Sequence, residues 1–443
     1  MTDGGAPPAR ATAAGANRAI DAVWRIESAK IIASLARMLR DIGLAEELAQ
    51  DALVAALETW PAGGVPDNPG AWLMATAKRR ALDVLRRRKL LDRKHEELAY
   101  ELELDQELAN RQAEAAQDDE IGDDLLRLVF TACHPVLSPD ARVALTLRLL
   151  GGLSTEEIAR AFLVPEPTIA QRIVRAKRTL AEARVPFEVP SGDALAERLA
   201  SVLEVIYLVF NEGYSATAGD HWMRPQLCEE ALRLGRVLAE LAPREPEVHG
   251  LVGLMEIQAS RAHARISPGG EPVLLLEQDR SRWDRLLIGR GLAALARAER
   301  LGGALGRYAL QAAIAACHAR ASAAEDTDWR RIAALYDALA QVAPSPIVEL
   351  NRAVAVAMAF GPAAGLEVVE SLASEPVLDG YHLLPSVRGD LLAKLGRHAE
   401  ARDAFERAAS LTRNTREREL LLERAARCSR NAGSPDDPQG SDA

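Results

Sequence analysis

The chain has 443 residues, of which 48% are hydrophobic and only 4% aromatic, and its formal net charge is −10. This length is enough for about two to four domains with cores of their own. Ala, Leu and Arg are abundant, and the alternating Val/Ile/Thr runs typical of exposed strands are nearly absent. Because the abundant residues are strong helix formers, we predict an all-α protein.

Several classes of protein are excluded by what the chain lacks. Its four cysteines are scattered and form no CxxC pair, which argues against a disulfide framework and a zinc site. No hydrophobic run is long enough to span a bilayer, and the N-terminus has no apolar signal segment. Phosphate-binding loops and the HExxH, GxSxG and EF-hand patterns are absent. We therefore expect a cytoplasmic protein that is not an enzyme and uses no metal, cofactor or membrane partner.

Residues 20–93 show the spacing of helices joined by short loops, after a polar tail over residues 1–19 that we expect to be disordered. A first helix is predicted to end at Gly43, which suits a C′ position. A second helix covers "AEELAQDALVAALETW" and has one apolar side. Its other side is polar and carries Glu46, Glu47, Gln50 and Asp51.

A strongly basic helix follows a loop that contains three prolines and three glycines in the ten residues 61–70. Between Lys78 and Lys94 nine basic residues stand against two acidic ones, whereas residues 96–124 hold twelve acidic residues and one basic. Trp72 lies at the start of the charged stripe. Cationic side chains with a flat aromatic ring are typical of single-stranded nucleic acid binding. The alternative is a solvated basic face with Trp72 packed under the preceding loop.

The segment "GLSTEEIARAFLVPEPTIAQRIVRAKRTL" has the pattern of a helix-turn-helix. Ser154 and Glu157 form a capping box, "VPEP" breaks the chain, and Pro167 suits the start of a second helix. One face of this second helix is apolar, and the opposite face carries Gln and Arg side chains that can contact base edges in the major groove. The alternative is an ordinary helical hairpin with a polar outer face.

The rest of the chain reads as Ala/Leu-rich helices up to residue 430, followed by a polar tail over 431–443. Two blocks align with an offset of 35 residues, with Gly361 over Gly396, close to the tetratricopeptide period. A solenoid of such repeats favours a protein or peptide partner. Polar clusters at "NEGY" (211–214) and "DRSRWD" (279–284) are either a ligand site or buried ion pairs that hold helices together.

Together the motifs resemble an extracytoplasmic-function (group 4) RNA polymerase sigma factor of the sigma-70 family, in the subgroup with a C-terminal tetratricopeptide-like extension. The resemblance implies region 2 at 20–93, an acidic linker at 94–124, region 4 as a helix-turn-helix at 125–187, and the helical extension at 188–430, clearest over 346–413. It also implies core RNA polymerase and promoter DNA as partners, with transcription modulated by the extension.

The resemblance assigns residues to three contacts. Core polymerase would be bound by Glu47, Gln50 and Asp51. The melted −10 element would be held by Asp67, Asn68, Trp72, Lys78, Arg79 and Arg86. The duplex −35 element would be read by Thr168, Gln171, Arg172, Val174, Arg175 and Arg178.

The competing interpretation is a helix-turn-helix one-component regulator with a tetratricopeptide sensor. It explains the second motif and the repeats but gives residues 20–93 no role. Such a regulator binds duplex DNA alone, whereas a sigma factor requires core polymerase for tight, promoter-selective binding.

Overall fold

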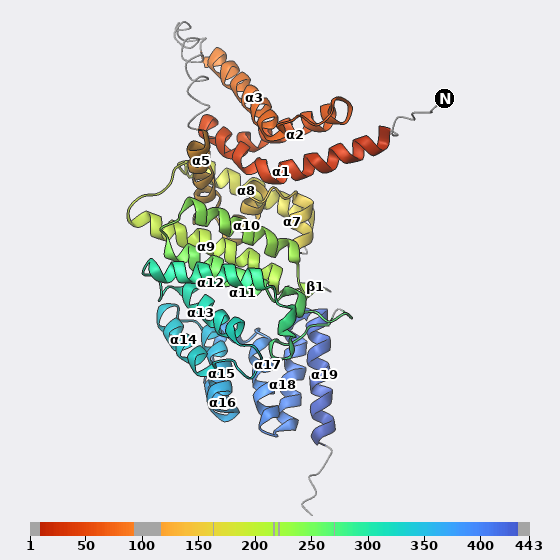
Figure 1. The fold of residues 1–443 in the computed structure, drawn as a ribbon, viewed down its shortest axis with the longest axis vertical. Coiled ribbons are helices and arrows are strands. Elements are labelled where there is room, and N and C mark those ends of the chain that lie inside the picture. The colour runs from red at the N-terminus through yellow and green to blue at the C-terminus, as the bar shows by residue number, and fades with distance from the viewer. Residues whose placement is uncertain are drawn as a thin grey trace, which may run out of the picture. The chain divides into compact units, whose positions relative to one another are not determined.

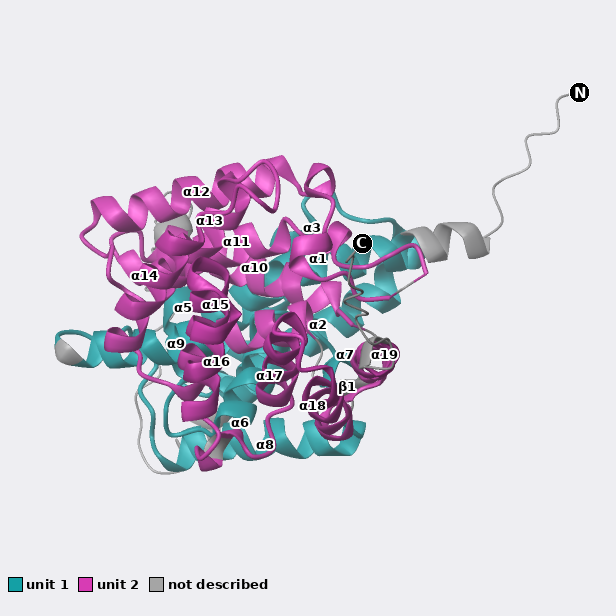
Figure 2. Cartoon of the chain, turned by 90° about the horizontal axis from the view of Figure 1, so that it is seen from below, with its two compact units in different colours: residues 1–206 teal, residues 207–443 magenta. Residues whose placement is uncertain are grey.

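The computed structural model describes residues 9–92, 117–162, 164–215, 218–219, 222–269 and 271–432. The chain divides into two compact units, residues 1–206 and 207–443 (Figure 2). Helices dominate both units, which confirms the all-α prediction (Figure 1). The strands among the described residues are two segments of two residues each. No described helix is both long and apolar enough to cross a bilayer.

Unit 1 contains seven described helices and the first part of an eighth. These are α1 (Ala9–Leu39), α2 (Ile42–Gly63), α3 (Pro69–Asp92), α5 (Gln117–Ala132), α6 (Pro139–Leu149), α7 (Thr155–Phe162), α8 (Glu166–Glu182) and the start of α9 (Asp193–Tyr214). Helix α1 begins inside the segment for which a disordered tail is expected. Residues 93–116, which hold most of the expected acidic linker, lie outside the described residues.

Helices α1, α2 and α3 share one apolar core. Helix α1 contributes Ile20, Ile31, Ile32 and Leu35, each no more than 1% exposed, and the predicted apolar side of α2 and the buried side of α3 pack against them. The predicted end of the first helix at Gly43 is wrong. Helix α1 stops at Leu39, and Asp41 starts α2 by accepting a hydrogen bond from the backbone N–H of Leu44, 3.0 Å away. Asp41 therefore supplies the N-cap signal, and Gly43 belongs to the first turn of α2.

The predicted helix-turn-helix is present as α7 and α8. The capping box is confirmed, because the Ser154 N–H donates to Glu157 Oε2 (2.8 Å) and the Glu157 N–H donates to Ser154 Oγ (3.1 Å). The predicted apolar face of the second helix is also confirmed, since its four residues are all buried: Ile169, Ile173, Ala176 and Leu180. Helix α8 begins at Glu166, one residue before Pro167.

Helix α9 crosses the boundary between the units, and its first part is tied to α5 and α6. Arg198 donates to the Phe130 carbonyl (2.7 Å), and Ser201 Oγ donates to the Cys133 carbonyl (2.6 Å). Arg142 of α6, only 8% exposed, donates to Ser201 Oγ at 2.5 Å and to a Glu204 carboxylate oxygen at 3.1 Å. These bonds place the start of α9 in the same unit as the helix-turn-helix.

Unit 2 is built from helices that follow one another in hairpins. After α9 come α10 (Pro225–Leu241), α11 (Pro246–Ala259), α12 (Arg285–Arg300), α13 (Arg307–Arg320), α14 (Trp329–Val342), α15 (Pro346–Phe360), α16 (Pro362–Ser371), α17 (Leu383–Lys394), α18 (His398–Leu411) and α19 (Thr415–Ala432). Short 3₁₀ turns occur at Ala262–Ala264, Leu275–Glu277, Arg280–Arg282 and Pro376–Leu378. The two blocks with the 35-residue offset form α15–α16 and α17–α18.

The turns of these two hairpins use glycines at equivalent positions. Gly361 joins α15 to α16 with a φ of +103°, and Gly396 follows α17 with a φ of +75°. A side chain is strained at such positive φ values, so glycine is required at both turns. A parallel pair of short strands, β1 (Ala218–Gly219) and β2 (Arg413–Asn414), joins the start of unit 2 to the segment between α18 and α19.

The two polar clusters of unit 2 have structural contacts. Glu212 forms an ion pair with Arg224, while Asp279 and Asp284 accept backbone N–H groups at the starts of the helices that follow them. Arg280 is 7% exposed and donates to the carbonyls of His318 (2.5 Å) and of a residue just after α13. Of the two interpretations, the structure therefore favours contacts that hold helices together.

Candidate polymerase and nucleic-acid interface

The three residues of α2 that the resemblance assigns to core polymerase differ in their exposure to solvent. Glu47 is exposed, whereas Gln50 and Asp51 are half-buried. Asp51 forms an ion pair with Arg80 of α3, with 3.0 Å between Asp51 Oδ2 and Arg80 Nη1. The Asp51 carboxylate thus links the two helices, and Glu47 is the most accessible of the three.

Glu46, next to Glu47, is a residue that periodicity placed wrongly. The helical pattern puts it on the polar face, yet it is only 5% exposed. Its carboxylate accepts Arg148 Nε of α6 at 2.5 Å and also pairs with the Lys177 ammonium of α8. No local signal reveals this role, because the two partners lie 102 and 131 residues further along the chain. Glu46 therefore joins α2 to the helix-turn-helix part of unit 1.

Two of the residues assigned to the −10 element already make contacts within the protein. Asp67 is exposed, but Asn68 Oδ1 accepts the backbone N–H of Ala71 at 3.1 Å and so caps α3. Trp72 is half-buried and packs edge-to-face on Trp60, with ring centroids 5.4 Å apart. This packing corresponds to the alternative interpretation of Trp72, as a residue held against the preceding segment.

The basic side of α3 keeps most of its charge open to solvent. Arg79 and Arg86 are exposed and Lys78 is half-buried. Arg86 lies 3.8 Å from the Asp83 carboxylate one turn earlier, a long and exposed pair of little energetic weight. The face can therefore attract a polyanion over several turns of helix.

The outer face of α8 is exposed along its length. Val174 is 65% exposed, and Thr168, Gln171, Arg175 and Arg178 are also exposed. Arg175 forms no ion pair with any residue that the structure describes. A helix with this face fits a major groove, where Gln and Arg can donate to base edges.

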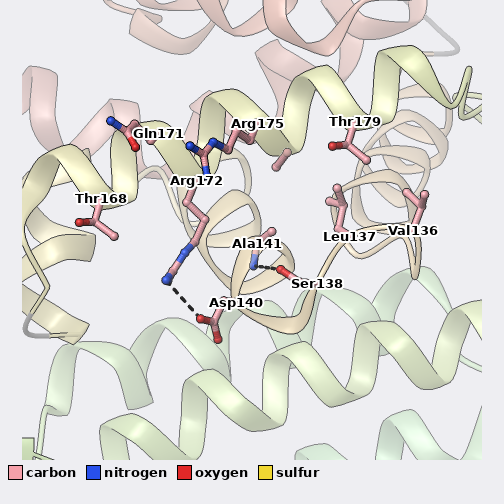
Figure 3. Close-up of a pocket in the computed structure, with 11 residues that line it drawn as sticks. Val136, Leu137, Ser138, Asp140, Ala141, Thr168, Gln171, Arg172, Arg175 and Thr179 are labelled. Carbon is pink, nitrogen blue, oxygen red and sulfur yellow. Dashed lines mark hydrogen bonds and ion pairs between the residues drawn. The ribbon is translucent and has the colours of Figure 1, made fainter.

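A cavity of about 400 Å³ lies beside this face, between α8 and the start of α6 (Figure 3). Across it, the Arg172 guanidinium of α8 reaches Asp140 of α6 at 3.2 Å (Figure 3). Ser138 Oγ caps α6 by accepting the Ala141 N–H at 3.4 Å. Gln171, Arg172 and Arg175, which the resemblance assigns to the −35 element, therefore line one groove.

Burial shifts the pKa values of two titratable groups in unit 1. Burial raises the pKa of the Cys133 thiol to about 11 and lowers the pKa of His134 to about 4, the latter with help from the Arg198 charge. Neither group changes its charge near neutral pH. All four cysteines of the chain are buried free thiols, and the described residues contain no group of acidic, Cys and His side chains that could hold a metal.

The chain is similar to known proteins along most of its length. Residues 27–90 match sigma-70 region 2, residues 127–180 match sigma-70 region 4, and residues 198–299 match DUF6596, a family of unknown function. The probable ECF RNA polymerase sigma factor SigI of Mycobacterium tuberculosis (strain CDC 1551 / Oshkosh) is 28% identical over 166 residues, which cover 38% of this chain and 56% of SigI.

A longer match extends through the helical extension. An uncharacterized protein of Rhizobium meliloti (strain 1021) is 46% identical over 387 residues, covering 87% of this chain and 90% of that protein. The chain therefore belongs to the same family as the Rhizobium meliloti protein, and it carries the region 2 and region 4 domains of the sigma-70 family.

Proposed function

We propose that the protein is a sigma factor that binds core RNA polymerase and directs promoter-specific initiation, as a member of the extracytoplasmic-function group. The observation that carries this proposal is the presence of both sigma-70 regions in one unit, with the outer face of α8 exposed. Region 2 would bind polymerase through Glu47, Gln50 and Asp51. The protein would act in the cytoplasm, where polymerase and promoter DNA are found, without catalysis or a cofactor of its own.

Run-off transcription with purified core polymerase tests this function. We expect the full chain to support initiation at promoters selected from a random library, while core polymerase alone does not. The Glu47→Ala variant should bind core polymerase more weakly, because this carboxylate is exposed on the assigned docking helix. If no promoter is selected and the chain alone binds a duplex tightly, the protein is instead a one-component regulator.

In promoter binding, Lys78, Arg79 and Arg86 would follow the phosphates of the melted strand, and Asp67, Asn68 and Trp72 would hold −10 bases. Because Asn68 and Trp72 are engaged within the fold, their base contacts would require the α2–α3 loop to rearrange. The exposed residues of α8 would read the duplex −35 element, as the pattern of Gln and Arg side chains predicts.

Replacing Arg175 by alanine should cost about 1–3 kcal/mol of discrimination at one base pair of the −35 element, because a bidentate contact to guanine is lost. The measurement is holoenzyme binding to duplexes with each substitution in the −35 element. Arg178→Ala serves as a control, since Arg178 already pairs with Glu182 at 3.2 Å and should be less specific. An equal loss on every sequence would make Arg175 a phosphate contact.

We further propose that the tetratricopeptide-like extension is a positively acting part of the sigma factor and receives a protein or peptide partner. The support is the pair of hairpins α15–α16 and α17–α18 with glycine turns at equivalent positions. Stacked hairpins form surfaces suited to gripping a helix or peptide. Deleting residues 207–443 should therefore abolish transcription in the run-off assay. Increased transcription would make the extension a brake, and unchanged transcription with unchanged core affinity would remove it from regulation.

A further inference from the structure

The cations of helix α8 are mostly paired with carboxylates of the same chain. Four cations occupy the helix from Arg172 onward, and only Arg175 forms no ion pair with a described residue. The partners of the others are Asp140 for Arg172, Glu46 for Lys177 and Glu182 for Arg178. Three of the four charges that would attract DNA are thus compensated within the protein.

Two of these paired cations flank the exposed face of the helix. At 100° per residue, Arg172 and Lys177 each lie about 110° from its centre, on opposite sides. A helix seated in the major groove has a sugar–phosphate backbone along each side, so cations on its flanks are placed to contact phosphates. The central positions, such as Gln171 and Arg175, are placed to contact bases.

The two flanking pairs differ in how easily they open. The Lys177–Glu46 pair is largely buried, with the carboxylate side chain 6% exposed. The Arg172–Asp140 pair is open on its acidic side, where the Asp140 side chain is 73% exposed at the edge of the groove (Figure 3). An exposed ion pair contributes little to stability, so a phosphate can displace the Asp140 carboxylate from Arg172.

We propose that Asp140 is a positioning residue that competes with DNA phosphate for the Arg172 guanidinium. By holding Arg172 in the groove between α6 and α8, Asp140 keeps its guanidinium away from DNA phosphates. One phosphate contact is thus lost with every duplex, whatever its sequence. Its negative charge at the edge of the groove also repels an approaching phosphate. Affinity for non-promoter DNA falls, and base contacts by Gln171 and Arg175 account for a larger share of −35 binding. This inference rests on the proposed role of α8 as the −35 reader.

The Asp140→Asn variant tests the competition in holoenzyme, with a selected promoter duplex and a non-promoter duplex of equal length. We expect affinity for the non-promoter duplex to rise about three- to tenfold. The slope of log affinity against log salt should become more negative by about one, which corresponds to one additional phosphate contact. Affinity for the promoter duplex should rise by a similar factor, because the regained phosphate contact does not depend on sequence. Misfolding cannot imitate this result, because it would weaken binding.

Three further variants separate release of Arg172 from a general loss of negative charge. Glu166→Gln removes one exposed carboxylate from the first turn of α8, and Glu166 forms no ion pair with a described residue. It should leave the salt slope unchanged. In an Arg172→Ala background, Asp140→Asn should leave the slope of log affinity against log salt unchanged. Asp140→Glu keeps the carboxylate, so this single variant should bind DNA as the wild type does.

The result that overturns the competition is an Asp140→Asn variant with the same salt slope and affinity as Glu166→Gln, or with weaker binding than wild type. That result leaves the sigma function intact, provided that wild-type holoenzyme initiates at its selected promoters. Failure of wild-type holoenzyme to initiate overturns the proposed function itself, so the two failures are distinguishable.

Discussion

Replacing Glu46 by alanine should destabilise unit 1 by about 3–5 kcal/mol, because it removes the carboxylate from a largely buried cluster and leaves two cations without it. Arg148 and Lys177 have side chains only 18% and 23% exposed, so water replaces the lost partner poorly. Urea unfolding of a fragment comprising residues 1–206, followed by circular dichroism, measures the effect. The contact between α2 and the helix-turn-helix should weaken with it.

Glu47→Ala is the matched control for this prediction. Glu47 is adjacent, has the same charge and is exposed, so its loss should change the free energy of unfolding by no more than about 0.5 kcal/mol. We expect Glu47→Ala to lower the affinity for core polymerase while the free energy of unfolding stays within that limit. Equal destabilisation by the two variants would show that the Glu46 cluster contributes nothing beyond an ordinary surface charge.

A fragment that ends at Pro186 should fail to fold stably, whereas one that ends at Ile206 should unfold cooperatively. The shorter fragment loses the four hydrogen bonds that Arg198, Ser201 and Glu204 make with α5 and α6. Such bonds, several of them to charged groups, contribute about 1–3 kcal/mol each. Their joint loss is comparable to the whole stability of a typical domain, about 5–15 kcal/mol. Thermal unfolding followed by circular dichroism distinguishes the fragments.

The longer fragment carrying both Arg198→Ala and Ser201→Ala provides the control for chain length. It keeps residues 193–206 of α9 but lacks three of the four bonds, so its midpoint should fall clearly below that of the unmodified fragment. Identical midpoints for the fragments ending at 186 and 206 would show that α9 does not support the helix-turn-helix. Tests of the extension should therefore remove residues from 207 onward.

The features that sequence predicts well are those determined by residues close together in the chain. The Ser154–Glu157 capping box spans three residues, and the apolar face of α8 follows from spacing within one helix. Both are present as predicted because neighbouring residues alone decide them. The all-α fold follows in the same way from composition and periodicity.

The features that sequence predicts poorly depend on distant partners or on competing local signals. Glu46 appears polar and exposed within its helix, but Arg148 and Lys177 arrive from other helices and bury it. Trp72 appears available for stacking until Trp60 packs against its edge. After α1, Gly43 suits the end of a helix whereas Asp41 suits the start of one, and in the structure Asp41 caps the start of α2. Periodicity within a helix carries no information on any of these outcomes.

The pairing of β1 with β2 has a consequence for the order in which the protein is made. Residues 218–219 cannot acquire their partner strand until residues 413–414 have left the ribosome. Domains nearer the N-terminus generally fold first during synthesis, at about 5–20 residues per second. For about 10–40 s, a nascent chain thus presents a complete unit 1 beside an extension whose two ends are not yet joined. Only chains that extend past residue 414 can form this strand pair, so any regulation that depends on it begins only when translation is nearly finished.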